Sequence, residues 1–178
     1  MAKILFVISI LIAFSSSLFA QEKSGSKAVE FMSCRDSLLI KEYHNLVGPS
    51  DMDFQVLIVT NHDTGKKLGC MKIEKSNGSE TFSGTIDYEE IDACIKSIDY
   101  VKTTIMTAAP KVYSEASFRT LDGVSFSAFY VEKNKRWSAG FNIVENNYRS
   151  GITLDLATLE TLKNAFVVAK SKIEELLK

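Results

Sequence analysis

One segment constrains the fold more than any other: Gly84 to Ile98, which is echoed by Leu154 to Phe166. At an offset of 68 positions, aspartate aligns with aspartate and apolar residues align with apolar residues. The aligned pairs are Asp87 with Asp155, Ile91 with Leu159, Cys94 with Leu162, Ile98 with Phe166, Val101 with Ala169 and Ile105 with Ile173. Because an internal repeat sets the whole architecture, we expect one structural unit to occur twice.

Each copy is predicted to be a strand that runs directly into a helix. Asp87 and Asp155 stand where a carboxylate satisfies free backbone N–H groups at a helix start, and Glu90 completes a capping box in the first copy. Apolar residues then recur three or four positions apart, the spacing of one helix face. Burying six of them yields roughly 10 kcal/mol, whereas ordering about 18 residues costs roughly 1–2 kcal/mol each. Each helix therefore needs a sheet to lie against.

Four strands are predicted before each helix, because the apolar period there changes to two. In the first half they are Leu38 to Tyr43, Met52 to Ile58, Lys67 to Glu74 and Thr81 to Ile86. In the second half they are Tyr113 to Leu121, Val124 to Tyr130, Trp137 to Ile143 and Gly151 to Leu154. The expected fold is α+β, made of two tandem ββββα repeats with a pseudo-two-fold relation. Each antiparallel sheet is expected to be covered by its own helix.

Residues 1–20 are predicted to be a signal peptide. Lys3 gives a short positive start, Ile4 to Phe14 is an apolar run, and small residues precede a cut after Ala20. The run is too short to span a bilayer, although a retained anchor helix is the alternative. Gln21 follows the cut, so no cysteine is present there to accept a lipid. We expect the mature chain of 158 residues to be exported, either periplasmic or secreted, with no stable membrane anchor.

The mature chain is expected to form one globular unit over 31–178, after a polar, flexible leader at 21–30. The first repeat is predicted to cover 31–107 and the second 108–178. Each repeat has only about 75 residues, a length at which an isolated core is marginal. Two copies that share one core are therefore favoured over two separate domains.

Two resemblances arise at the junctions between strand and helix. Arg149 to Leu156, with the apolar positions that follow, resembles the last strand and helix of the positive-cofactor type of single-stranded-DNA-binding coactivator. The doubled order of four strands and a helix is similar to Whirly and Pur-repeat proteins, which implies a sheet that binds single-stranded nucleic acid. The chain also resembles exported proteins of Gram-negative bacteria that have no assigned activity. That likeness rests on Gly84 to Ile98, Thr64 to Met71 and the Asp122-Gly123-Val124 turn.

The candidate binding residues are basic and aromatic residues of the second half: Lys133, Lys135, Arg136, Trp137, Tyr148 and Arg149. Nucleic-acid binding needs cations for the phosphates and rings that stack on bases. Residues 21–107 carry 10 Lys and Arg against 14 Asp and Glu, and residues 108–178 carry 10 against 8. The net charges of −4 and +2 argue against nucleic acid as a partner. A solvated hairpin tip, or a protein or glycan contact centred on Trp137, are the other interpretations.

No catalytic residue, metal ligand or cofactor site is predicted. His44 and His62 lack partners at metal-ligand spacing, and the acidic run Glu89, Glu90 and Asp92 is explained by the helix dipole. Cys94 aligns with core Leu162 and is expected to be a buried thiol. A disulfide between Cys34 and Cys70 and a disulfide between Cys70 and Cys94 are both left as alternatives, because the sequence does not give the connectivity.

The leading interpretation is an exported, non-enzymatic accessory or binding module that uses a sheet surface or hairpin tips against an unknown macromolecule, such as a protein. One alternative is a binder of single-stranded nucleic acid or another polyanion. Another is an extracellular hydrolase or enzyme inhibitor.

Overall fold

The structure, a computed structural model, describes residues 25–178; the predicted signal peptide lies outside the described residues. Two separate four-stranded antiparallel sheets form, each with its strands in chain order. The first contains β1 (Leu39–Leu46), β2 (Asp53–Asn61), β3 (Lys67–Asn77) and β4 (Glu80–Asp87). The second contains β5 (Glu115–Arg119), β6 (Ser125–Val131), β7 (Arg136–Asn142) and β8 (Gly151–Leu154). The α+β class with two antiparallel sheets is confirmed.

A helix follows each sheet. After β4, a 3₁₀ turn (η1, Tyr88–Glu90) leads into α3 (Ile91–Tyr100), which continues as a π-helical turn (η2, Val101–Ile105). After β8, α4 (Leu156–Leu176) runs nearly to the end of the chain. The backbone N–H of Asp87 donates to Glu90 Oε2 at 3.3 Å, and Asp155 Oδ1 accepts from the backbone N–H of Thr158 at 2.7 Å. Both aspartates therefore stand at helix starts, as predicted.

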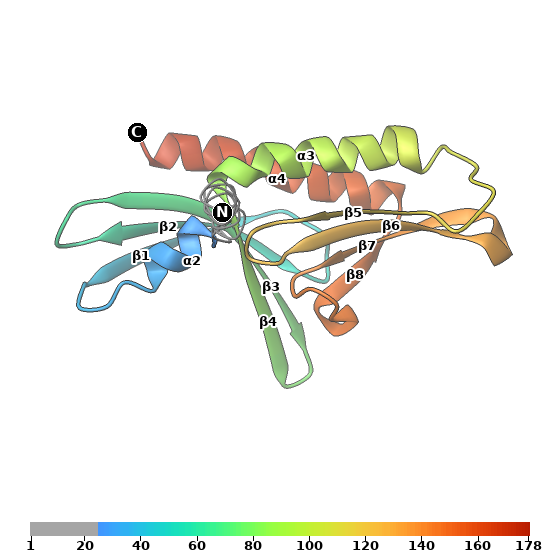
Figure 1. Cartoon of the computed structure of the whole chain (residues 1–178). Helices are drawn as coiled ribbons and strands as arrows, with labels where there is room; N and C mark the ends of the chain where they lie inside the picture. The colour runs from blue at the N-terminus through green and yellow to red at the C-terminus, as the bar shows by residue number, and fades with distance from the viewer. Residues whose placement is uncertain (1–24) are drawn as a thin grey trace, which may run out of the picture.

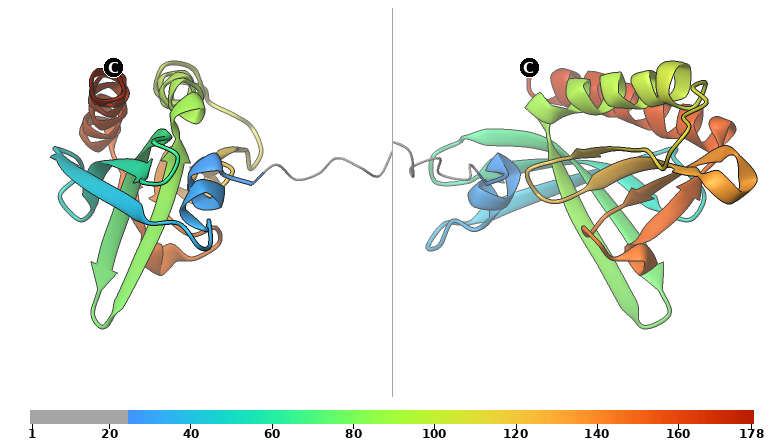
Figure 2. Two further views of the ribbon diagram at one scale, coloured as in Figure 1. Left: turned by 90° about the vertical axis from the view of Figure 1, so that its left-hand side faces the viewer. Right: turned by 45° about the vertical axis from the view of Figure 1, so that its right-hand side comes forward.

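The helices α3 and α4 lie side by side and antiparallel above the sheets (Figures 1 and 2). Three ion pairs join them, and their order shows the opposite chain directions. These pairs are Asp92 with Lys170 at 2.6 Å, Asp99 with Lys163 at 2.8 Å and Lys102 with Glu160 at 2.5 Å. The helices thus form one layer rather than two separate covers.

The helices do not stay over their own sheets, which corrects the sequence-based expectation. Helix α4 packs across β1, β2 and β3 of the first sheet and approaches the second sheet at β8. A Cβ atom on Gly69 of β3 would lie 2.6 Å from Ile173 Cγ2 of α4, so this glycine permits the close approach. Helix α3 instead runs along β5 of the second sheet (Figure 1). Tyr100 of α3 and Phe118 of β5 line the same groove between the two elements. The antiparallel pairing of the helices carries each one toward the other sheet.

One hydrophobic core joins both sheets and both helices. Phe141 of β7 lies between Phe54 of β2 and Phe166 of α4, with ring centroids 6.4 Å away on either side. The predicted apolar faces of the helices are buried: Ile91, Ile98, Leu159 and Phe166 are all at most 2 % exposed. A shared core is therefore present.

A short helix before β1 corrects the predicted flexible leader. Helix α2 (Lys27–Met32) overlaps the last residues of the predicted leader at 21–30 and ends two residues after it. Its residue Ala28 is fully buried. The buried Asp87 carboxylate accepts from Ser26 Oγ at 2.8 Å and from the backbone N–H groups of Lys27 and Ala28 at 2.7 and 3.0 Å. These bonds fix α2 against the face of the first sheet opposite α4. There, Leu57, Val59 and Cys70 form a second apolar cluster with Ala28.

The turn between β5 and β6 is fastened to the first sheet. Asp122 Oδ2 accepts from the backbone N–H and the hydroxyl of Thr85 at 2.7 and 2.8 Å. Glu90 Oε1 accepts from the backbone N–H of Leu121 at 2.8 Å, while burial raises the pKa of the Glu90 carboxyl. These contacts hold one end of β5 in place.

Candidate binding surface on the second sheet

The outer face of the second sheet is lined by small polar side chains. Because successive side chains alternate between faces, Phe126, Ala128 and Phe141 point to the core while their neighbours point away. Two rows of outward residues cross β5, β6 and β7 in register. One row is Ser117, Ser127 and Gly140, and the other is Arg119, Ser125 and Asn142. The result is a strip of hydroxyl and amide groups that crosses three strands.

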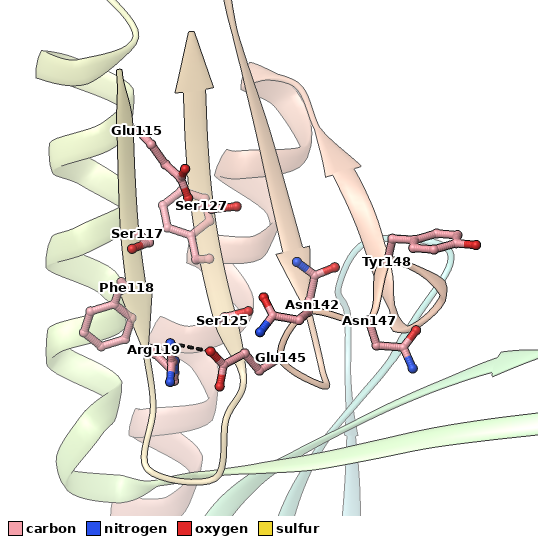
Figure 3. A pocket seen from close by; sticks show the side chains of 12 residues that line it. Glu115, Ser117, Phe118, Arg119, Ser125, Ser127, Asn142, Glu145, Asn147 and Tyr148 are labelled. Atoms are coloured by element: carbon pink, nitrogen blue, oxygen red, sulfur yellow. Dashed lines mark ion pairs between the residues drawn. The ribbon is translucent and has the colours of Figure 1, made fainter. Parts of the chain in front are cut away.

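An open groove of about 560 Å³ runs over this strip (Figure 3). Its floor is formed by β5, β6 and β7, and its wall by the segment after β7. The lining residues are Glu115, Ser117, Phe118, Arg119, Ser125, Phe126, Ser127, Asn142, Glu145, Asn146, Asn147 and Tyr148. Most of them carry hydroxyl or amide groups, which both donate and accept hydrogen bonds. The groove therefore suits a polar, uncharged surface or backbone.

The charged residues of this groove are Glu115, Arg119 and Glu145, which sum to a net charge of −1. Arg119 forms an ion pair with Glu145, so its cation is engaged within the groove. Glu115 accepts a hydrogen bond from the Tyr113 hydroxyl at 2.9 Å, and this bond raises the pKa of Tyr113. The ring of Tyr148 is 86 % exposed at one end of the groove. An exposed ring beside neutral donors and acceptors is typical of a binding surface.

The six residues proposed from sequence fall into two groups at opposite ends of β7. Lys133, Lys135, Arg136 and Trp137 lie at the β6–β7 hairpin, whereas Tyr148 and Arg149 follow the other end of the strand. Arg149 pairs with Glu80 of the first sheet at 3.0 Å. Only Tyr148 lines the groove. The structure thus separates the proposed basic and aromatic cluster.

Trp137 is engaged by its own neighbours. Its indole N–H donates to the backbone carbonyl of Ala108 at 2.9 Å, and its ring packs edge-on against Tyr130 with centroids 5.6 Å apart. The side chain is half-buried against the core rather than free on the hairpin tip. Trp137 therefore closes the end of the core between β7 and the Ala108 segment.

The three cysteines are free thiols. Cys94 is buried, as its alignment with Leu162 predicted; Cys70 is buried under α2, and Cys34 is exposed. Burial raises the pKa of Cys70 and of Cys94 from 9.0 to about 12, so both thiols stay protonated at neutral pH. Neither disulfide that the sequence left open is present.

Within residues 25–178, no group of three or more His, Cys, Asp or Glu side chains is placed to hold a metal ion. The acidic residues at the start of α3 are engaged in structural contacts: Glu89 with Lys27, Glu90 with Leu121, and Asp92 with Lys170. The lining of the groove contains serine hydroxyls but no histidine or cysteine. The part of the chain that the structure describes also has no helix long and apolar enough to cross a membrane.

The serine pattern was visible in the sequence but was not assigned to a site. Ser117, Ser125 and Ser127 alternate with apolar residues, which indicates outward strand positions. Their convergence depends on the pairing register between β5, β6 and β7, which periodicity alone does not give. Comparisons of this chain with protein-family models, with curated proteins and with solved structures find no match.

Proposed function

We propose that this protein is an exported, non-enzymatic binding module that holds a partner protein against the outer face of its second sheet. The observation that carries the proposal is the groove of about 560 Å³ over β5, β6 and β7. A single sheet face that is polar, concave and lined by small side chains lets another chain approach its backbone closely.

The charge of the groove favours a protein over a nucleic acid. Phosphate binding needs free cations, because counterion release supplies most of its affinity. Arg119 is the only basic residue in the lining, and it is paired with Glu145. A hydrolase would need a nucleophile with a nearby base, and the serines of the groove have no histidine beside them in its lining.

We also propose that the two halves of the chain are copies of one ββββα unit with exchanged helices. The order of four strands and a helix, found twice, and the aspartates at both helix starts support this proposal. Exchange explains how two units of about 75 residues stabilise one another through a common core.

Site-specific photo-crosslinking tests the proposed binding face. A photoreactive residue replaces Ser127 in the groove or, as the matched control, exposed Ser83 on β4. Expressed in the cells that make the protein, the Ser127 variant is expected to give one discrete protein adduct, and the Ser83 variant none. Adding Tyr148→Ala is expected to weaken that adduct. The absence of an adduct at Ser127, or equal adducts from both positions, would contradict the proposal.

Export is tested separately. Amino-terminal sequencing of the protein from the periplasmic and extracellular fractions is expected to begin at Gln21. A chain that begins at Met1 and sediments with membranes would instead support a retained anchor.

A further inference from the structure

The strand β5 is an edge of the second sheet, and its pairing shows which backbone groups are free. Tyr130 donates its backbone N–H to the carbonyl of Ser114 at 2.8 Å, and Thr120 donates to Val124 at 2.9 Å. Because hydrogen-bonded pairs alternate along antiparallel strands, even-numbered residues of β5 face β6. Glu115, Ser117 and Arg119 therefore turn their N–H and C=O groups outward. No described residue accepts from or donates to these groups.

A second groove lies along the same edge, on the helix side. It has a volume of about 350 Å³ and lies between α3 and β5. Tyr100 and Val101 line it from the helix, and Ala116 and Phe118 line it from the strand. In Figure 3, α3 runs along β5 on the side away from β6. The helix thus forms an apolar wall beside the position that a further strand would take.

The two sides of this vacant strand position differ in chemistry. On the helix side, Tyr100 and Phe118 are apolar, and Lys96 adds one positive charge for which no described residue supplies a paired carboxylate. On the opposite side, Glu115 and Ser117 belong to the polar groove. A strand placed here would present alternate side chains to an apolar wall and to a polar face.

We propose that β5 accepts an extended segment of the partner protein as a fifth strand of the second sheet. This inference rests on the proposed function and identifies how the partner is held. The segment has apolar residues at alternate positions, which pack against Tyr100 and Phe118, and an acidic residue in the same register that pairs with Lys96. Its other side chains are polar and face Ser117. Strand addition of this kind gains affinity from backbone bonds and specificity from alternate side-chain pockets.

A second copy of this chain fits the same edge less well. Pairing of β5 with β5 would bring two α3 helices onto the same side of the joined sheet. Since α3 runs along the free edge (Figure 3), the second α3 would be directed into the space that the first one occupies. A single extended segment lacks such a helix.

The test uses random peptides, displayed on phage and selected on the mature protein. A selected peptide is synthesised, and its Kd is measured for the wild type, for Ser117→Pro and for Lys41→Pro. Proline at 117 removes an outward N–H and leaves the β5–β6 bonds intact, as edge strands allow. Lys41→Pro is the matched control, because Lys41 is an outward residue on the edge strand β1. We expect Ser117→Pro to weaken binding about tenfold or more, and Lys41→Pro to leave binding unchanged.

Peptide N-methylation keeps the test valid if Ser117→Pro fails to fold. Methyl groups on alternate amides that face β5 should abolish binding, whereas methyl groups on the intervening amides should not. Equal effects in both registers would overturn strand addition, as would a library that yields no peptide sensitive to Ser117→Pro. Peptides sensitive to Ser127→Trp but not to Ser117→Pro would retain the proposed face and overturn the added strand. A wild-type dimer in sedimentation that Ser117→Pro dissociates would identify a second copy as the occupant.

Discussion

The two sheets have the same strand order but differ in what covers them. The first sheet has α4 on one face and α2 on the other, so Leu57 in the middle of β2 is 1 % exposed. Phe129, five residues into the corresponding strand β6 of the second sheet, is 36 % exposed. The second sheet has α3 on its inner face and the groove on its outer face. Two sheets of the same strand order thus differ in that one is covered on both faces and the other keeps an exposed outer face.

The difference arises from the side chains that face away from the common core. In β2 these include Leu57 and Val59, which need an apolar cover. In β6 they include Ser125 and Ser127, which are satisfied by water or by a polar ligand. The outward-facing side chains therefore decide whether a sheet face takes an apolar cover or stays exposed to water.

The largest expected loss of stability comes from releasing α2 from the first sheet. Asp87→Ala removes the acceptor for three donors: the buried hydroxyl of Ser26 and the backbone N–H groups of Lys27 and Ala28. Because buried donors without acceptors are costly, we expect a loss of about 3 kcal/mol in the free energy of unfolding. Urea denaturation measures the loss, and limited proteolysis should show cleavage within α2. Asp155→Ala, at an exposed helix cap, is the control and should cost about 1 kcal/mol.

A pair of glycine substitutions sharpens the contrast in packing. Gly69→Ala places a Cβ 2.6 Å from Ile173 of α4 and should cost about 1–3 kcal/mol. Gly140→Ala on the second sheet meets only the carbonyl oxygen of Ile152 at 3.6 Å and should change stability by less than about 0.5 kcal/mol. Thermal or urea unfolding compares the two variants. Equal losses would mean that α4 does not press on the first sheet.

The thiols give a prediction that depends on pH. Cys70 and Cys94 ionise near pH 12 when folded and near 9.0 when unfolded, so the unfolded chain loses its protons first. Their contribution to stability is therefore full below pH 9 and is lost as the pH rises toward 12. The loss is at most about 1.4 kcal/mol per pH unit for each thiol. Urea unfolding at several pH values should show a shallower decline in Cys70→Ala, after correction for its stability at pH 7.

The smallest expected effect on stability comes from a substitution on the proposed binding face. Tyr148→Ala removes a ring that is 86 % exposed, so the free energy of unfolding should change by less than about 0.5 kcal/mol. The photo-crosslink at Ser127 should nevertheless weaken. A large loss of stability would show that Tyr148 supports the fold instead of a ligand.

Periodicity and capping residues were enough to predict the strands and the buried helix faces. Ile91 and Leu159 lie in the core because apolar spacing and an aspartate at the start specify an amphipathic helix. The positions of α3 along β5 and of α4 across β1, β2 and β3 were missed, since they depend on how the two helices pack together rather than on either segment alone. Helix α2 was missed because its stabilising acceptor, Asp87, lies 61 positions from Ser26 in the chain.

The residues of the candidate binding surface were also not predictable from local sequence patterns alone. Single basic and aromatic residues such as Trp137 suggested a cluster on the hairpin, but the structure engages that indole in a bond to Ala108. The serines that form the groove come from β5 and β6, and only the register brings them together. Local patterns therefore indicated which side chains face outward, whereas pairing decided which of them share a surface.

Thiol labelling shows whether the first sheet is covered on both faces while the outer face of the second sheet is open. Leu57→Cys and Phe129→Cys are made separately in a Cys34→Ser, Cys70→Ala background, because Cys70 also lies under α2 and would react once α2 is released. The reaction of each variant with a maleimide is followed under native conditions. We expect the thiol at 129 to react readily, and the thiol at 57 to react only after Asp87→Ala releases α2. Protection at 129, or rapid reaction at 57 with α2 in place, would contradict this difference between the sheets.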